Sequence, residues 1–287
     1  VYVYYGTKDG PKTTYDRLYT GDQAGAAFGS ALAMAGDVDG DGYNDLVVGA
    51  PNFDYEETDA GAAYVFHGSK DGLGATWDWR AISDQPEADF GVAVDLAGDV
   101  NGDGYDDVII GAPGYAYEPA ALGSVFVYHG SKDGLPAQVS WRADSGQSTA
   151  WFGMAAGTAG DVNLDGYDDV IVGAYKYNAD QPDEGGAFVY FGTPTGLQST
   201  YGWWTVGDKA DAWYGFSVAT AGDVDRDGSA DVLVGAPNYR VDRDLMGRAY
   251  LYMGEASDEP PPAPTPTEPP ELNGSSLYLP VMLCENP

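Results

Sequence analysis

The 287-residue sequence contains little cysteine, histidine or positive charge. Its single cysteine, Cys284, cannot form a disulfide within the chain, so cysteine usage does not identify the redox compartment. With 13 Lys and Arg against 45 Asp and Glu, the net charge is −32, and repulsion disfavours binding to nucleic acid or to an anionic membrane. No apolar run approaches the roughly 18 residues that a membrane span needs. Cations are the partners that this charge favours.

What the sequence does contain indicates a β-rich protein. The 41 Gly and 22 Tyr within a chain that is 44% hydrophobic suit many tight turns between strands. Apolar stripes at the helical period are not evident, which argues against a helical fold. We therefore expect an all-β globular domain.

An aromatic-glycine pair recurs every 62 residues, at Phe28-Gly29, Phe90-Gly91, Phe152-Gly153 and Tyr214-Gly215. The segments between the pairs follow the same period: a Gly-Asp pair comes eight residues after each one, and a Gly-Ala-Pro triplet, or Gly-Ala-Tyr in the third copy, comes later. Such register over four copies identifies a tandem repeat.

Each repeat contains four runs typical of short strands, which in the first copy read SALAMAG, DLVVGA, GAAYVFHG and TWDWRAIS. Turn residues separate the runs, so one unit is predicted to be a four-stranded antiparallel meander. A lone meander cannot cover both faces of its sheet, and tandem four-stranded units are typical of β-propeller blades. The small residues Ala31, Ala33 and Ala35 suit the crowded strand nearest the axis. A β-sandwich or a solenoid is the alternative.

The phase of the repeat predicts three regions: a partial β-propeller over residues 1–254, a Pro-rich linker over 255–272 and a short tail over 273–287. The tail is either a docking or sorting segment or an unstructured end.

The chain begins and ends its repeats at a third strand, without an initiator Met or a signal peptide. We therefore expect a processed or truncated product: about four blades of an incomplete propeller whose earlier blades are absent. Residues 13–19 could instead supply a missing outer strand and close a ring of four, which would leave the strand over residues 1–5 unused.

An acidic loop follows the first strand of every repeat. Oxygen atoms at positions 1, 3, 5, 7 and 9 of the loop converge if it curls around a point, and Gly at position 6 allows the sharp turn. Position 7 contributes its backbone carbonyl. Such a cage suits calcium better than magnesium and resembles the first half of an EF-hand loop. The predicted ligands of up to four calcium ions are Asp37, Asp39, Asp41, Tyr43 and Asp45; Asp99, Asn101, Asp103, Tyr105 and Asp107; Asp161, Asn163, Asp165, Tyr167 and Asp169; and Asp223, Asp225, Asp227, Ser229 and Asp231.

Two further interpretations concern these loops. Asn101 and Asn163 keep an oxygen ligand but lower the charge of the second and third loops by one, so these sites are predicted to be weaker. The alternative for all four loops is an acidic turn held by hydrogen bonds without a metal. The two histidines, His67 and His129, occupy equivalent ends of third strands, which indicates a structural role.

The combination of Phe-Gly, Gly-Asp-x-(Asp/Asn)-x-Asp-Gly-x-x-Asp and Gly-Ala-Pro resembles the FG-GAP repeat of integrin α-subunit head domains and of many secreted bacterial proteins. The resemblance covers residues 1 to about 254. It implies a β-propeller, usually of seven blades, with calcium in the acidic loops and a role in extracellular adhesion or recognition. Tyr214 in place of Phe and Tyr175 in place of Pro depart from the pattern.

The function that we predict is an extracellular module, secreted or at the cell surface, that binds a protein or a glycan. The alternative is a propeller-based hydrolase or lyase acting on an extracellular polymer, but no catalytic set of residues stands out. The oligomeric state is not indicated.

We expect recognition at the loops between second and third strands, because these loops vary within a repeating frame. They span residues 51–60, 113–122, 175–184 and 237–246 and carry aromatic residues that could anchor a partner: Phe53, Tyr55, Tyr115, Tyr117, Tyr177 and Tyr239. Trp151 and Trp213 either shape the same rim or pack between blades. Asp95 replaces a small residue and would place one carboxylate near the axis.

Overall fold

A computed structural model of the chain describes residues 1–118, 121–242 and 244–255; for residues 117, 118, 121 and 122 it describes the backbone alone. The predicted linker after Glu255 and the predicted tail over residues 273–287 lie outside the described residues. The boundaries of these two regions therefore remain predictions.

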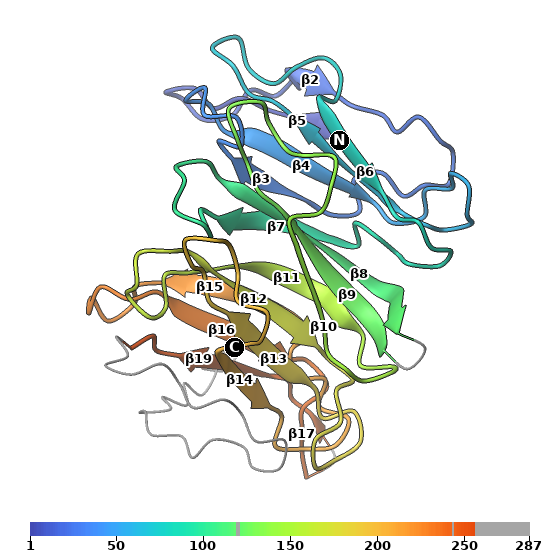
Figure 1. Ribbon diagram of the computed structural model, residues 1–287, viewed down its shortest axis with the longest axis vertical. Helices are drawn as coiled ribbons and strands as arrows, with labels where there is room; N and C mark the ends of the chain where they lie inside the picture. The colour runs from blue at the N-terminus through green and yellow to red at the C-terminus, as the bar shows by residue number, and fades with distance from the viewer. Residues whose placement is uncertain (119–120, 243, 256–287) are drawn as a thin grey trace, which may run out of the picture.

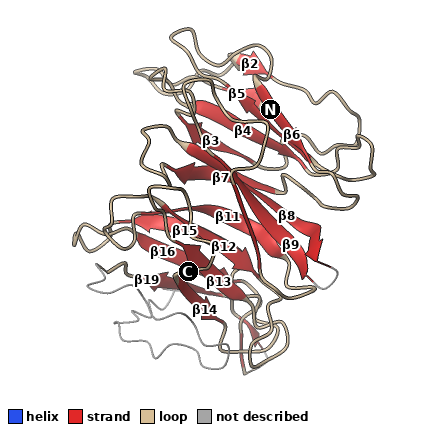
Figure 2. Ribbon diagram, viewed as in Figure 1, coloured by secondary structure: helices blue, strands red, loops and turns tan. Residues whose placement is uncertain are grey.

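The described residues form strands and no helix (Figures 1 and 2). Three units are four-stranded antiparallel sheets with the strands in sequence order, as the meander prediction required. The first sheet contains β3 (Leu32–Gly36), β4 (Asp45–Ala50), β5 (Ala62–Phe66) and β6 (Trp79–Ile82). The second contains β7 (Ala93–Gly98), β8 (Asp107–Glu118), β9 (Ala121–Tyr128) and β10 (Trp141–Asp144). The third contains β11 (Phe152–Gly160), β12 (Asp169–Ala174), β13 (Gly186–Tyr190) and β14 (Trp203–Val206).

The two ends of the described chain are partial blades. The last unit pairs β15 (Ser217–Gly222), β16 (Asp231–Ala236) and β19 (Arg248–Tyr252), and its second loop carries a small hairpin of β17 (Arg240–Val241) and β18 (Asp244–Leu245). At the other end, β1 (Tyr2–Val3) pairs with β2 (Arg17–Leu18). Because β2 pairs with β1 and lies far from β19 (Figure 1), residues 13–19 do not close a ring of four.

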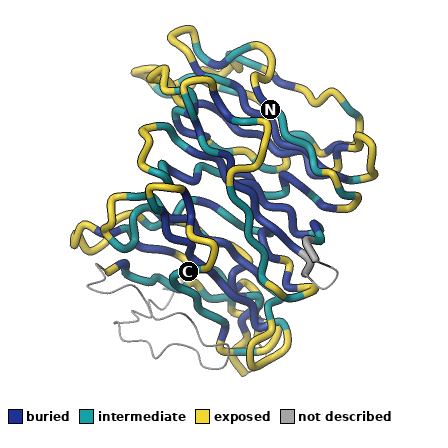
Figure 3. Tube along the Cα trace, viewed as in Figure 1, coloured by how far each residue is buried: buried dark blue, intermediate teal, exposed yellow. Residues whose placement is uncertain are grey.

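The sheets are arranged as the blades of a partial β-propeller, which confirms the predicted fold class. The innermost strands β3, β7, β11 and β15 contact one another in succession, and buried residues form hydrophobic clusters that each join neighbouring sheets (Figure 3). One detail differs from the sequence prediction. Residues 113–118 and 121–122, expected to belong to a loop over 113–122, continue the β8–β9 pair beyond Ala112, with irregular register.

The aromatic-glycine pair and the Gly-Ala pair join neighbouring blades. Phe90 is buried in a core cluster with Val47 and Val65 of the preceding blade. A side chain on Gly49 would overlap the carbonyl oxygen of Gly91 in the next blade, so both positions need glycine. The same approach recurs between later blades, and this close backbone packing explains why the two motifs repeat together.

Asp95 lies on the innermost strand β7, where the sequence placed it, and its carboxylate lies against the next blade, which the sequence did not indicate. A side chain on Gly157 of β11 would overlap its carboxylate, and the equivalent positions on the other inner strands carry Ala or Gly. Burial raises the pKa of Asp95 above its ordinary value, while a hydrogen bond from the Leu96 N–H opposes the shift. The carboxylate therefore opposes folding when it is charged.

Replacing this carboxylate, in Asp95→Ala, is expected to raise the free energy of unfolding at pH 7 by about 1 kcal/mol, since Ala is the residue of neighbouring inner strands. The pKa is higher in the folded than in the unfolded state, so the carboxylate's cost is present at neutral pH and vanishes below the unfolded-state pKa. Urea titrations from pH 7 down to about pH 4 should show the gain shrinking. A gain that does not change with pH would contradict this assignment.

Candidate metal centres

Each acidic loop is held by hydrogen bonds from its own backbone to its carboxylates. In the first loop, the Asp37 carboxylate accepts the N–H groups of Asp41 at 3.0 Å and Gly42 at 2.8 Å. Gly42 has a φ of 89°, the left-handed turn that position 6 was predicted to need. The other three loops repeat the pattern, as with Gly104 N–H to Asp99 at 2.8 Å. The loops therefore curl around their first carboxylate.

The carboxylate at position 9 connects each loop to the third strand of the same blade. In the second loop, Asp107 is fully buried and accepts the N–H groups of Val100 at 3.1 Å and Gly130 at 2.8 Å. Asp45, Asp169 and Asp231 are equally buried and make the equivalent pair of bonds. One oxygen of each carboxylate thus holds the loop, and the other holds the end of the third strand.

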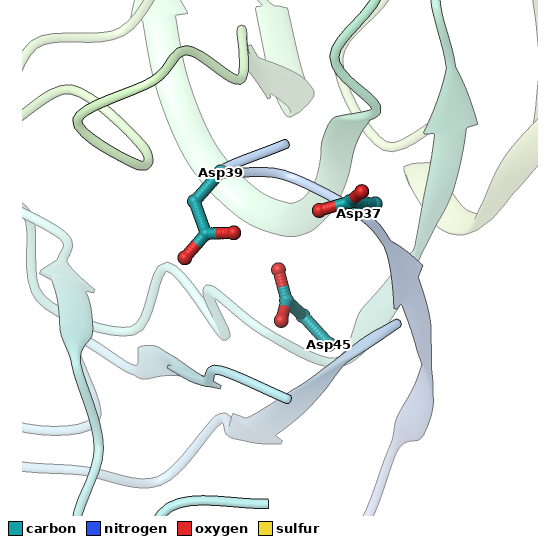
Figure 4. Close-up of side chains that lie close together, drawn as sticks. All are labelled: Asp37, Asp39 and Asp45. Atoms are coloured by element: carbon teal, nitrogen blue, oxygen red, sulfur yellow. The ribbon is translucent and has the colours of Figure 1, made fainter. Parts of the chain in front are cut away.

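Two loops gather three carboxylates closely. In the first loop, oxygen atoms of Asp37, Asp39 and Asp45 lie within 4.8 Å of one another, and their side chains point toward a common space (Figure 4). In the fourth loop, the close group consists of Asp223, Asp225 and Asp227, so Asp231 at position 9 stays outside it. Among the residues described, no other such carboxylate groups are found.

The second and third loops differ because asparagine occupies position 3. The Asn101 side-chain amide donates to Asp103 at 3.0 Å, and Asn163 donates to Asp165 at 2.9 Å. Each amide oxygen accepts the backbone N–H of the same aspartate. Aspartates at positions 1, 5 and 9 of these loops are present and hydrogen-bonded, but they are not brought as close together as the groups in the first and fourth loops.

The donor set fits a hard cation such as calcium. Burial raises the pKa of Asp45 to about 6 and those of Asp107 and Asp169 to about 8, and neighbouring carboxylates add to the shift. A divalent cation would supply the missing positive charge, and carboxylate, amide and carbonyl oxygens are the ligands that calcium takes. The assignment of all twenty predicted ligand positions remains a prediction.

The sequence did not reveal that His67 contacts the first acidic loop. Its Nδ1 lies 3.1 Å from a carboxylate oxygen of Asp39. The imidazole also lies against Gly134 in the next blade, while His129, one period later, lies against Gly196. Their recurrence at equivalent strand ends was the available signal, and it agrees with a structural role for both histidines.

Comparison with known proteins agrees with this repeated geometry. The model of the FG-GAP repeat matches residues 28–66, 90–128 and 214–252. The chain carries three FG-GAP repeats. Each matched segment runs from the aromatic-glycine pair to the end of the third strand. The unit that begins at Phe152 lies outside the matched segments, although it forms a complete four-stranded blade, and it is the unit with Tyr175 in place of Pro.

The curated relatives include integrin alpha chains. This chain is 33% identical over 168 residues to integrin alpha-6 of Gallus gallus, 36% over 163 residues to integrin alpha-3 of Mus musculus, and 37% over 173 residues to integrin alpha-PS2 of Drosophila melanogaster. These matches cover 55% of this chain but only 12–15% of the relatives. The chain therefore corresponds to a small part of each relative. Within the described residues, no helix is long and apolar enough to cross a membrane.

At the opposite end of the blades, the structure corrects most of the predicted aromatic anchors. Phe53, Tyr115 and Tyr239 are buried, Tyr177 is half-buried, and only Tyr55 is well exposed, at 66%. The side chain of Tyr117 lies outside the described part. The four buried or half-buried rings recur every 62 residues, and three of them pack on third-strand aromatics of their own blades. Periodic recurrence within a variable loop was therefore a sign of core packing.

A different set of aromatic residues gathers at this end, between the third and fourth units. Tyr175 lies 5.9 Å from Trp151, 5.7 Å from Trp213 and 5.4 Å from Phe216, measured between ring centroids. We call these four residues the aromatic cluster. The Lys176 ammonium lies 5.7 Å from the ring centroids of Trp151 and Tyr175. Trp151 and Phe216 are 36% and 38% exposed, so the cluster is partly open to solvent.

The aromatic cluster consists of departures from the repeat. Ala27 and Asp89 occupy the positions equivalent to Trp151 and Trp213, and Pro replaces Tyr175 in the other copies. Both tryptophans have a positive φ, 56° and 57°, as do Ala27 and Asp89 at the equivalent positions, so this backbone conformation belongs to the repeat and only the bulky side chains are a departure from it. Partly exposed tryptophans from two units thus meet around one tyrosine that only the third unit carries.

Proposed function

We propose that this chain is a calcium-binding extracellular β-propeller module that recognises a protein or glycan with the end of its blades opposite the acidic loops. The observation that carries the proposal is the set of four phased, oxygen-rich loops, two of which hold three carboxylates within 4.8 Å. Similarity to integrin alpha chains supports an extracellular, adhesion-type propeller.

Calcium has a structural role in this proposal. Up to four ions would be held by the predicted positions 1, 3, 5, 7 and 9 of the loops, with the position 9 carboxylate linking each ion to the third strand. Without a cation, the carboxylates of one loop repel each other by about 1 kcal/mol per pair even in a water-like dielectric. An ion would remove that repulsion and hold the turn between first and second strands.

The aromatic cluster is the recognition surface that we favour. Exposed tryptophan and tyrosine are common anchors in interfaces, and Trp151 and Trp213 stand where the first two copies have Ala27 and Asp89. Three departures from the repeat converge on one place, whereas the remaining loops keep periodic rings in the core. A binding module explains this arrangement better than a catalyst does. His67 and His129 lie beside the acidic loops, at the end of the blades opposite the aromatic cluster, and each packs against a glycine of the next blade.

Arrays of glycans and of extracellular proteins, screened with calcium and with a chelator, test the proposal. Tyr175→Pro, which restores the residue of the other copies, is expected to weaken binding at least tenfold, the loss of about 1.4 kcal/mol typical of an interface anchor. Tyr55→Ala, on another exposed loop, is the matched control and should retain binding. Binding that is lost in Tyr55→Ala but kept in Tyr175→Pro would place recognition outside the aromatic cluster. Turnover of a polymer in a parallel panel of hydrolase and lyase assays would show that the function is enzymatic.

A further inference from the structure

We propose that Asp106 and Asp168 are positioning residues for calcium binding in the preceding blade: each fixes the first ligand residue of a neighbouring loop without belonging to that loop. The inference rests on the proposed calcium function. Both residues occupy position 8 of their own loops, next to the buried position 9 aspartate, and both are half-buried. The predicted ligand positions do not include them.

The contact across the blade boundary is reciprocal. The Asp37 N–H donates to Asp106 Oδ2 at 2.8 Å, and the Asp106 N–H donates to the Asp37 carbonyl at 3.2 Å. One period later, the Asp99 N–H donates to Asp168 Oδ2 at 2.9 Å, and the Asp168 N–H donates to the Asp99 carbonyl at 3.2 Å. The backbone of the first ligand residue is therefore held on both sides by the next blade.

The loops leave room for this contact. A side chain on Gly36 would overlap the Asp106 carboxylate, and a side chain on Gly98 would overlap that of Asp168. A second contact between the same two loops also requires glycine, because a side chain on Gly40 would overlap the ring of Tyr105. The Gly-Asp pair and the position 4 glycine of one loop thus match the Tyr-Asp pair of the following loop.

The boundary between the third and fourth units lacks both partners. Ala230 replaces the position 8 aspartate and Ser229 replaces the tyrosine, and Leu164 stands where the first two loops have glycine. The backbone bond from Ala230 N–H to the Asp161 carbonyl, at 2.9 Å, is kept. Alanine has no side-chain acceptor for the Asp161 N–H, so the third loop lacks the cap that the first and second loops have.

The consequence for calcium is preorganisation. The carboxylate of a position 1 aspartate must lie close to the ion and also to the backbone amides of its own loop. When the next blade caps the backbone of this aspartate, the side chain is restricted to that geometry before the ion binds. In an uncapped loop, the free-energy cost of ordering the position 1 aspartate would instead reduce the affinity for calcium. The first and second sites should therefore bind calcium more tightly than they would without Asp106 and Asp168.

Calcium titration of the full chain, followed by the NMR amide signals of Gly42, Gly104, Gly166 and Gly228, reads each site separately because each glycine N–H donates to its position 1 aspartate. Asp106→Ala is expected to weaken the first site about tenfold, the loss of one hydrogen bond to an ionised acceptor. Ala230→Asp is expected to strengthen the third site, where Gly160 leaves the space open. Asn44→Ala is the matched control. Asn44 occupies position 8 of the first loop, so this variant measures how a substitution at position 8 affects the loop that contains it.

An unchanged first site in Asp106→Ala overturns the inference, and so does weakening confined to that variant's own second site. If Asp106→Ala does not fold in circular dichroism, Ala230→Asp decides alone, and a third site no tighter than before overturns the inference. Failure of the proposed function gives a different result, in which none of the four glycine signals of the unaltered chain responds to calcium.

Discussion

Removing calcium with a chelator is expected to lower the melting temperature of this chain by at least about 10 °C, since each site at 100 times its Kd contributes about 2.7 kcal/mol and 1 kcal/mol corresponds to about 2–4 °C in a domain of this size. The buried carboxylates are the physical reason. Asp107 and Asp169 are fully buried, and their raised pKa values show that the fold without an ion opposes their charge.

Differential scanning calorimetry in calcium, in chelator and in chelator followed by excess calcium measures this effect. Recovery of the original melting temperature in the third condition controls for irreversible unfolding. Magnesium at the same concentration should restore less stability than calcium, because the cage would require magnesium to lose its bound water. Superimposable melting curves in calcium and chelator would contradict a structural calcium role.

The second large effect is expected at position 9 of the loops. Asp107→Ala should lower the free energy of unfolding by about 3 kcal/mol, because it leaves the buried N–H groups of Val100 and Gly130 without their acceptor at about 1–3 kcal/mol each. The substitution also removes the predicted link between the ion and the third strand. The loss should therefore be larger in calcium than in chelator.

Chemical denaturation of the variant and of the unaltered chain, with and without calcium, separates these two contributions. Asp133→Ala is the control, since the Asp133 side chain is 80% exposed and pairs with Lys132 on the surface, and it should change stability by less than about 0.5 kcal/mol. A loss in Asp107→Ala no larger than in this control would show that the position 9 carboxylate does not hold the loop.

The fold could be predicted because its information is periodic. Strands, turns and blade boundaries recur at 62-residue intervals from Phe28 to Tyr214, and antiparallel pairing of consecutive runs needs no knowledge of distant contacts. The curl of the acidic loops is equally local, since Gly42 and the Asp37 carboxylate are five residues apart. The aromatic anchors were mostly predicted wrongly, because variability between loops concealed the regular register of Phe53, Tyr115 and Tyr239.

The amino-acid sequence by itself determined the repeat, the four-stranded blade and the acidic loop that follows each first strand, because all three depend on residues close together in the chain. Only the tertiary structure decided which carboxylates gather, which tyrosines stay exposed, and that Asp106 reaches Asp37 across a separation of 69 residues. These outcomes depend on how one blade is seated against the next. Packing between blades brings distant residues to within a hydrogen bond of each other, and no spacing within a single repeat encodes that distance.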